Sequence, residues 1–224
     1  MFLNRNHIRE LMKILVIAAH PDDEVLGMGG TIKKHAKKGD EIHLCVVSEG
    51  ASAQYSDKKM IKNRRESCKK CGKILGIKNF TFLDFPDAQL DSIPQLEINK
   101  KLEKIILKIK PDIVYTISSG DLSKDHEKVF ESTIVSCRPI KNNIKKIFSY
   151  ELPGSRLIPF EPNVFENITS EIKFKTKAFL EYKSEVEKFP HPRSTEAIES
   201  LAKYRGSQVG IKFAECFKLI LARE

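Results

Sequence analysis

Residues 13–27, KILVIAAHPDDEVLG, join a strand-sized apolar run to a histidine and three consecutive carboxylates. A short apolar run that ends in polar residues is typical of a buried strand opening into a loop. The adjacent carboxylates repel one another unless a positive group holds them, and His20 and Asp23, three residues apart, can converge on one cation. This stretch therefore predicts a strand that leads directly into a metal site.

Outward from this stretch, strand-like and helix-like segments alternate. Short apolar segments rich in β-branched or aromatic residues predict strands at residues 13–19, 41–48, 79–83, 112–117 and 145–150. Helical periodicity, ended by glycine or proline, predicts helices at residues 26–38, 58–75 and 95–110. Strands separated by helices favour an α/β fold of Rossmann-like type, with a mostly parallel sheet between two helical layers.

The last third of the chain has a different pattern. Residues 152–168 contain three prolines and show no clear periodicity, and helices are predicted at 171–187 and 195–205 around the loop FPHPRS. The length suits one domain, residues 1–224, with a core of about 12–151 and a C-terminal extension, 152–224, that completes the active-site region.

Composition excludes several classes of protein. The chain is 41% hydrophobic and 31% charged, and its apolar runs fall far short of the ~20 residues that a membrane span needs. Residues 1–11 lack the apolar core of a signal peptide, and MKILVIAAH makes Met12 an alternative translation start to Met1. The five cysteines are odd in number and scattered, which favours a reduced, cytoplasmic protein.

The net charge of +9 raises the question of a nucleic-acid partner. The excess lysines, such as Lys101, Lys104 and Lys108, fall at helical spacing beside apolar residues and form solvated helix faces. The chain has no zinc-finger spacing and no basic block interleaved with aromatic residues. We therefore expect the positive charge to attract an anionic small molecule or to improve solubility. The sequence is compatible with a homo-oligomer.

A catalytic zinc site needs three protein ligands and one free position. In open parallel sheets, ligands bind beyond the carboxyl ends of the strands. The segment after the strand at 112–117, SSGDLSKDHEKVF, places Asp125 and His126 at this same edge. Helix capping is the alternative explanation for the acidic residues near His20, but capping does not require a histidine.

The other histidines differ in their suitability as ligands. His7 precedes the first strand, His35 lies in a lysine-rich helix and His43 lies among apolar residues, so core or surface roles are expected for them. His191 lies in a proline-flanked loop without an obvious packing purpose, and we expect it to reach the active site.

These motifs resemble those of a known family. AHPDDEVLGMGG followed by a later Asp-His pair resembles the PIG-L/LmbE family of zinc-dependent N-deacetylases, which act on N-acetylglucosamine-type conjugates. RRESCKKCGKILG is similar to that family's second helix, and FLDFPDAQL to its following loop. The core similarity covers about residues 13–150. The tail, with FPHPRS and YRGSQVG, looks like a bacterial branch of the family, so the resemblance spans nearly the whole chain. The exact substrate does not follow from the resemblance.

The resemblance implies roles for particular residues. His20, Asp23 and His126 correspond to the zinc ligands, and Asp22 to the general base. A zinc ion held this way lowers the pKa of its bound water toward about 7, and this water attacks the amide while Asp22 takes its proton. Two further carboxylates, Glu24 and Asp125, are expected to contact the ligand side chains and orient them without binding the metal.

One departure from the family pattern affects the mechanism. Many relatives have His-Pro-Asp-His where this chain has Ser123, Lys124, Asp125 and His126, so the general acid is either Asp22 or His191. Sugar, phosphate or nucleotide groups would need guanidinium and carboxylate partners. The candidates for substrate binding are Arg64, Arg65, Asp87 and Arg193.

The predicted function is removal of an N-acetyl group from an amino sugar that is linked to a nucleotide, lipid, thiol precursor or glycan. A non-haem iron enzyme could use the same His/Asp/His set. A dinucleotide-binding protein is a weaker alternative, because GMGG follows the acidic cluster and lacks GxGxxG spacing. A nucleic-acid-binding protein would not depend on His20.

Overall fold

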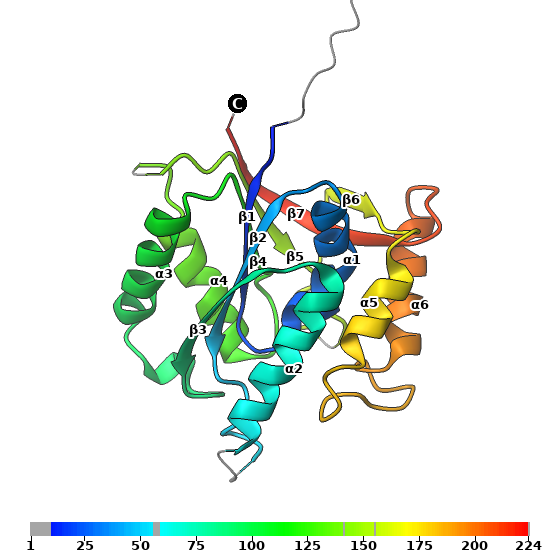
Figure 1. The fold of residues 1–224 in the computed structure, drawn as a ribbon, viewed down its shortest axis with the longest axis horizontal. Helices are drawn as coiled ribbons and strands as arrows, with labels where there is room; N and C mark the ends of the chain where they lie inside the picture. The colour runs from blue at the N-terminus through cyan, green and yellow to red at the C-terminus, as the bar shows by residue number, and fades with distance from the viewer. Residues whose placement is uncertain (1–9, 56–58, 141, 155, 224) are drawn as a thin grey trace, which may run out of the picture.

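The computed structural model describes residues 10–55, 59–140, 142–154 and 156–223, and these build one seven-stranded sheet in the order β3-β2-β1-β4-β5-β7-β6 (Figure 1). Neighbouring strands among β1 to β5 pair in parallel, whereas β7 pairs antiparallel with both β5 and β6. The strands are β1 (Lys13–Ala18), β2 (Glu41–Ser48), β3 (Asn79–Phe85), β4 (Ile113–Ile117), β5 (Lys146–Tyr150), β6 (Val164–Asn167) and β7 (Ala214–Ala222).

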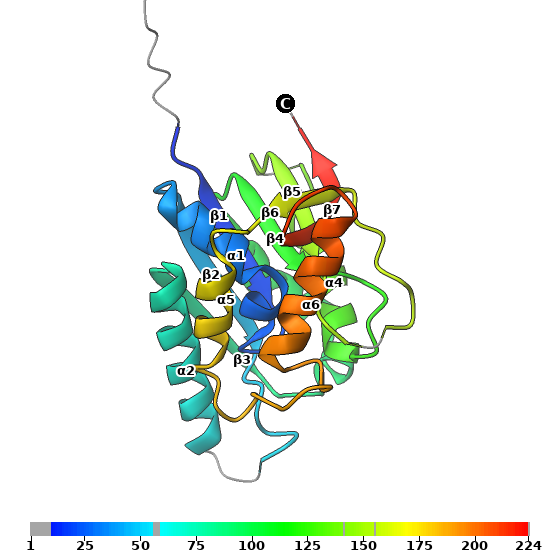
Figure 2. The same ribbon diagram turned by 90° about the vertical axis from the view of Figure 1, so that its right-hand side faces the viewer.

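Helices cover both faces of the sheet. Helices α3 and α4 pack against each other on one face, and α1, α2, α5 and α6 lie on the other (Figures 1 and 2). Their bounds are α1 (Asp23–Lys37), α2 (Lys59–Leu75), α3 (Gln95–Ile109), α4 (Lys124–Ser136), α5 (Ile172–Phe179) and α6 (Thr195–Ser207), with a 3₁₀ turn η1 (Leu90–Ser92). The α/β fold with a mostly parallel sheet and helices on both faces is therefore confirmed.

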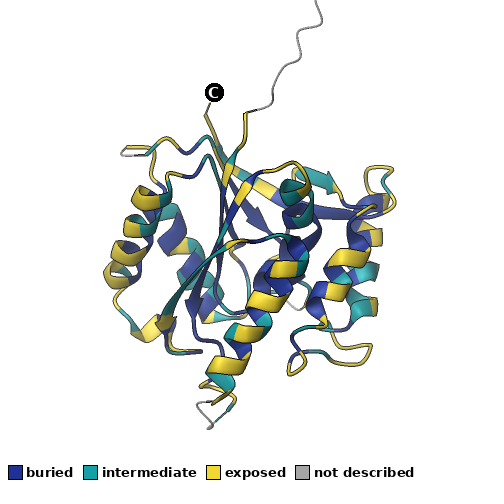
Figure 3. Ribbon diagram, in the orientation of Figure 1, coloured by how far each residue is buried: buried dark blue, intermediate teal, exposed yellow. Residues whose placement is uncertain are grey.

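Strand β1 occupies the point at which the strand order reverses. Its neighbours are β2 on one side and β4 on the other, and residues 14–18 are completely or almost completely buried (Figure 3). In open α/β sheets, ligands bind outside the carboxyl ends of the strands at this reversal. The loops after β1 and β4 therefore flank the expected binding position.

Helix α1 lies close to the sheet because it contains small residues. A methyl group added at Gly27 would lie 2.8 Å from Tyr150 Cε2 and closer still to Cδ2. The Tyr150 ring is fully buried and its hydroxyl donates to the Ile17 carbonyl, so it has little freedom to move away. The glycine is thus required by the close approach of α1 to β5.

Substituting Gly27→Ala is expected to lower the free energy of unfolding by roughly 1–3 kcal/mol, the usual cost of overpacking a rigid core. Chemical denaturation measures this change. Gly29→Ala is the matched control, because the nearest atoms to its added methyl group, on Val25 and Lys175, lie at 3.1 Å or more. Equal effects of the two substitutions would contradict a specific contact with Tyr150.

The last third of the chain differs most from the sequence prediction. Strands β6 and β7 were not predicted: β6 has only four residues, and the first half of β7 is buried throughout, so it lacks alternation. The helix predicted at 171–187 is wrong beyond Phe179, where α5 ends in turns. In this segment Tyr182 and Glu185 form buried polar contacts with other parts of the chain, and the backbone is not helical.

Two further predictions, the role of His7 and the start of a helix at Lys58, concern residues outside the described part of the chain. Within the part that is described, no helix combines the length and apolar character needed to cross a membrane.

Candidate metal centre

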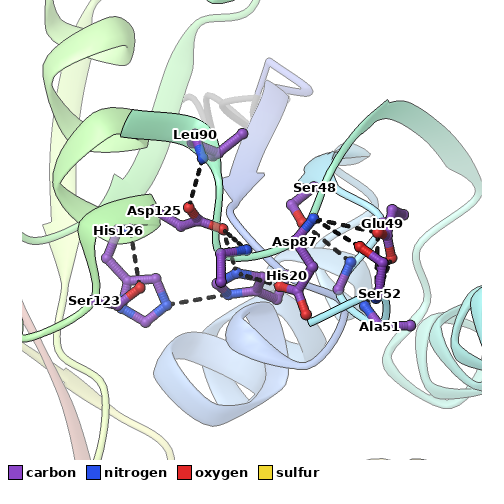
Figure 4. Close-up of polar contacts among 12 residues, drawn as sticks. His20, Ser48, Glu49, Ala51, Ser52, Asp87, Leu90, Ser123, Asp125 and His126 are labelled. Carbon is purple, nitrogen blue, oxygen red and sulfur yellow. Dashed lines mark hydrogen bonds and ion pairs between the residues drawn. The ribbon is translucent and has the colours of Figure 1, made fainter. Parts of the chain in front are cut away.

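His20 and His126 meet at the carboxyl ends of two neighbouring strands. His20 follows β1, and His126 lies in the first turn of α4, whose start is capped by the Ser123 hydroxyl accepting from the His126 N–H at 3.4 Å. Figure 4 shows the two rings facing each other, with His20 Nδ1 and His126 Nε2 3.3 Å apart. The two motifs, separated by about a hundred residues in the sequence, therefore form one cluster.

Asp23 completes a set of three possible ligands. Its carboxylate oxygens lie 3.6 Å from His20 Nδ1 and 3.6 Å from His126 Nε2. One ligand atom from each of the three residues lies within 4.8 Å of the others. Asp23 Oδ2 also accepts from the backbone N–H of His20 at 2.7 Å, so the carboxylate is fixed relative to the ring.

A carboxylate lies on the outer side of each of the two rings. Asp125 Oδ2 lies 2.9 Å from His20 Nε2, and Asp121 Oδ2 lies 3.1 Å from His126 Nδ1. Asp125 accepts a hydrogen bond from His20 Nε2 and so keeps the proton of a neutral imidazole on that outer nitrogen. His126 Nδ1 has no hydrogen-bond partner among the described residues, and the nearby Asp121 carboxylate favours the same tautomer through its negative charge. His20 Nδ1 and His126 Nε2 then face the Asp23 carboxylate. This donor set fits a divalent cation of the kind that imidazole and carboxylate ligands bind.

The electrostatics of the cluster favour an added positive charge. Burial acts to raise the pKa of the Asp23 carboxyl, but His126 and His20 outweigh it and hold that pKa well below its usual range. Burial acts to lower the pKa of His20, whereas hydrogen bonds to Asp125, Asp23 and Asp87 raise it above its usual value. Without a metal, a proton on His20 supplies the charge that a cation would bring.

Asp121 was not among the sequence candidates. It lies in the loop after β4, five residues before His126, and its carboxylate also lies 3.7 Å from Arg156 Nη1. Its backbone N–H donates to Glu127 at 3.1 Å, which fixes the loop. Sequence reasoning singled out the Asp-His pair and overlooked this earlier aspartate, although GDLSKDH contains it.

The structure also brings Asp87 and Asp125 to the far side of His20. Asp125 accepts backbone hydrogen bonds from Ala88 and Leu90, each at 2.9 Å, in addition to its bond with His20. Asp87 Oδ1 lies 3.2 Å from the same His20 nitrogen (Figure 4). Asp125 is thus held in place by the backbone, whereas Asp87 is the carboxylate with more freedom to contact another molecule.

Asp22 lies beside the three possible ligands but outside their set. The residue is fully buried, and neither carboxylate oxygen has a hydrogen-bond partner among the described residues. Arg64 and Arg193 approach it at 3.8 and 3.7 Å. Burial raises the pKa of the Asp22 carboxyl to about 6, although the two guanidinium groups oppose the shift. Such a group can exchange a proton near neutral pH.

Glu24 and Arg64 hold the backbone next to Asp22. Glu24 Oε2 accepts from the Asp22 N–H at 3.1 Å, and burial raises the pKa of Glu24 to about 7. Arg64 donates to the Pro21 carbonyl at 2.9 Å and forms an ion pair with Glu185. The contacts of Glu24 join it to Asp22 rather than to the three ligands.

The remaining candidates lie in different settings. Arg65 forms an ion pair with Asp84 and lies over the Phe82 ring on the edge strand β3, so the structure does not bring it to the cluster. His191 is exposed, and its Nδ1 accepts from the Arg193 N–H at 3.1 Å. Of these loop residues, Arg193 is the one that approaches Asp22.

The other histidines have packing roles. His35 bridges Asp40, at 2.7 Å, and the Tyr115 hydroxyl, at 3.1 Å. His43 lies 2.9 Å from the Thr81 hydroxyl on the neighbouring strand. Neither contributes to the described metal-binding groups, in agreement with the sequence expectation.

Comparison with known proteins places this cluster in context. Residues 15–136 match the PIG-L family, described as GlcNAc-PI de-N-acetylase. The deacetylase YaiS of Escherichia coli, itself uncharacterized, is 34% identical over 180 residues, covering 76% of this chain and 90% of YaiS. The diacetylchitobiose deacetylase of Thermococcus kodakarensis is 25% identical over 226 residues, covering 94% of this chain and 84% of that protein.

The fold alone is shared more widely. The structure of GalB, the 4-carboxy-2-hydroxymuconate hydratase of Pseudomonas putida KT2440, superimposes with a TM-score of 0.79 at 22% identity, covering 96% of this chain and 98% of GalB. The solved N,N'-diacetylchitobiose deacetylase of Pyrococcus horikoshii superimposes with a TM-score of 0.81 at 24% identity, covering 96% of this chain and 86% of that one, so a hydratase and a deacetylase share this architecture. The reaction must be argued from the residues of the site.

Proposed function

The chain belongs to the PIG-L family, and from that premise we propose that it is a metal-dependent hydrolase that removes the N-acetyl group from an N-acetylated amino sugar. The observation that carries this proposal is the convergence of His20, Asp23 and His126 beside the buried carboxylate of Asp22, which accepts no hydrogen bond from the described residues. Metal-assisted amide hydrolysis needs these two components, a ligand set and a separate base.

Zn²⁺ is the metal that we propose, because two imidazoles and one carboxylate are the ligand set of many hydrolytic zinc enzymes. When bound by His20, Asp23 and His126, it supplies a Lewis acid that polarises the amide carbonyl and lowers the pKa of water. Asp125 holds the His20 ring by a hydrogen bond, and the Asp121 carboxylate lies 3.1 Å from His126 Nδ1, where its charge favours binding of the metal through Nε2.

Asp22 is the proposed base. Its carboxylate accepts a proton from the attacking water and later returns a proton to the amine that leaves. His191 is exposed, and its ring bonds to the neighbouring backbone, so we assign both proton transfers to Asp22. Arg64 and Arg193 keep the carboxylate in place without bonding to either oxygen, which leaves the oxygens free for the reaction.

The proposed substrate class is an N-acetylglucosamine-type sugar, free or linked to another sugar, a nucleotide or a lipid. Two observations support it: the substrates named in the family description and in the relative at 25% identity, GlcNAc-PI and diacetylchitobiose, and the position of Asp87. This carboxylate lies beside His20 and could accept a hydrogen bond from a sugar hydroxyl. YaiS, which is named a deacetylase, is 34% identical to this chain, whereas the hydratase GalB is 22% identical.

A panel assay tests this function. The zinc-loaded protein is incubated with N-acetylglucosamine, N,N'-diacetylchitobiose and sugar nucleotides that carry an N-acetyl group, and free amine and acetate are both quantified. We expect equal amounts of the two products from at least one substrate, and none after the metal is removed by a chelator. A folded, zinc-loaded chain that releases no acetate from any of these compounds would contradict the proposal.

A further inference from the structure

The peptide unit before Asp22 is strained. Asp22 has φ 130° and ψ −25°, in a region of backbone conformation that residues other than glycine rarely adopt. Such strain persists only where surrounding contacts over-determine it, and it concentrates at functional sites. The contacts that hold this peptide are therefore informative about how the Asp22 carboxylate is aimed.

Two buried side chains hold the Pro21–Asp22 peptide from opposite ends. Glu24 Oε2 accepts from its N–H at 3.1 Å, and Arg64 Nη2 donates to its carbonyl oxygen at 2.9 Å. Glu24 is completely buried and Arg64 is 3% exposed, so water does not compete for either bond. A rotation of this peptide would break both hydrogen bonds at once.

Glu24 and Arg64 both contact the same backbone turn in the last third of the chain. The Tyr182 hydroxyl donates to Glu24 Oε1 at 2.5 Å, and Glu185 forms an ion pair with Arg64 Nη1. The Glu185 N–H donates to the Tyr182 carbonyl at 2.8 Å, which closes the turn. Tyr182 and Glu185 are 0% and 3% exposed.

We propose that Tyr182 and Glu185 are positioning residues that fix the strained peptide of Asp22 through Glu24 and Arg64. The inference deepens the proposed function, since it rests on Asp22 being the base. It also assigns a specific role to the segment after α5, because this turn sets the direction of a carboxylate that lies about 160 residues earlier in the sequence.

Packing alone does not explain this arrangement. A phenylalanine would fill the space of Tyr182 equally well, and burying a phenol costs free energy unless its hydroxyl is hydrogen-bonded. Likewise, Arg64 and Glu185 bury opposite charges where apolar residues would serve a purely structural purpose. Both polar pairs end on the same peptide unit, and this shared target favours positioning over general stability.

The test compares variants that remove hydrogen bonds from this network. Tyr182→Phe is expected to lower kcat about 10- to 100-fold, the usual effect of losing a supporting hydrogen bond, with KM and bound zinc unchanged. Glu24→Ala should show a similar loss, and Glu24→Gln, which keeps an oxygen for the Asp22 N–H, should restore most of it. Tyr115→Phe is the matched control, because it removes another buried hydroxyl, one that bonds to His35.

A readout independent of turnover completes the test. In a crystal structure of Glu24→Ala, we expect φ of Asp22 to leave the left-handed region. An unchanged Asp22 backbone, or wild-type kcat in Tyr182→Phe, would overturn the positioning role. An inactive wild-type protein would instead refute the proposed function, and the crystal structure would still decide whether Glu24 fixes this peptide.

Discussion

Substituting Asp22→Asn is expected to lower kcat by about 10²–10⁴-fold, the range for loss of a general base, while the metal stays bound. Asparagine has the same shape but cannot accept a proton at neutral pH. Asp22 lies outside the group formed by His20, Asp23 and His126, so the substitution removes no ligand. Steady-state kinetics and metal analysis of the same preparation measure both quantities.

The stability of this variant separates chemistry from folding. Arg64 and Arg193 each keep an ion pair with Glu185 when the Asp22 charge is removed, so we expect an unchanged thermal midpoint. Retention of more than a tenth of the wild-type kcat would show that another group takes the proton. Loss of zinc in the variant would instead place Asp22 among the ligands.

Substituting His126→Ala is expected to weaken zinc binding by roughly a hundredfold or more. Small structural zinc sites bind with apparent free energies of about 10–16 kcal/mol over four ligands, or roughly 3 kcal/mol for each ligand. Activity should fall in parallel at limiting zinc. Isothermal titration calorimetry of the metal-free protein with zinc measures the affinity directly.

Control variants show whether the effect is specific to the cluster. His191→Ala removes an exposed histidine and should leave zinc affinity unchanged. Asp121→Asn keeps the ligand but weakens its orientation, so its zinc affinity should fall between those of the wild type and His126→Ala. Full zinc affinity in His126→Ala would mean that the metal binds elsewhere.

The sequence predicted the first five strands because each is short, apolar and bounded by glycine, proline or charged residues. It also predicted where the ligands would converge, since the rule for parallel sheets depends only on strand order and direction. The structure brings one possible ligand atom from each of His20, Asp23 and His126 to within 4.8 Å of the others. Their roles stay predictions until the variants are measured.

Other features depend on contacts that no local pattern encodes. Asp121 belongs to the site because its side chain is directed at His126. Tyr182 and Glu185 belong to it because they contact residues more than a hundred positions away in the sequence. The helix expected to extend to residue 187 stops at Phe179, because these buried polar bonds outweigh helical propensity in the segment that follows. Propensity is a weak guide where tertiary contacts compete with it.

The position of β7 within the sheet has a consequence for the synthesis of the protein. This strand lies between β5 and β6, although it follows both in the sequence. Until residues 214–222 leave the ribosome, β5 presents an open edge and β6 has no partner strand. Exposed strand edges invite pairing with other chains. Nascent chains that stall before this strand should therefore depend on chaperones to stay soluble.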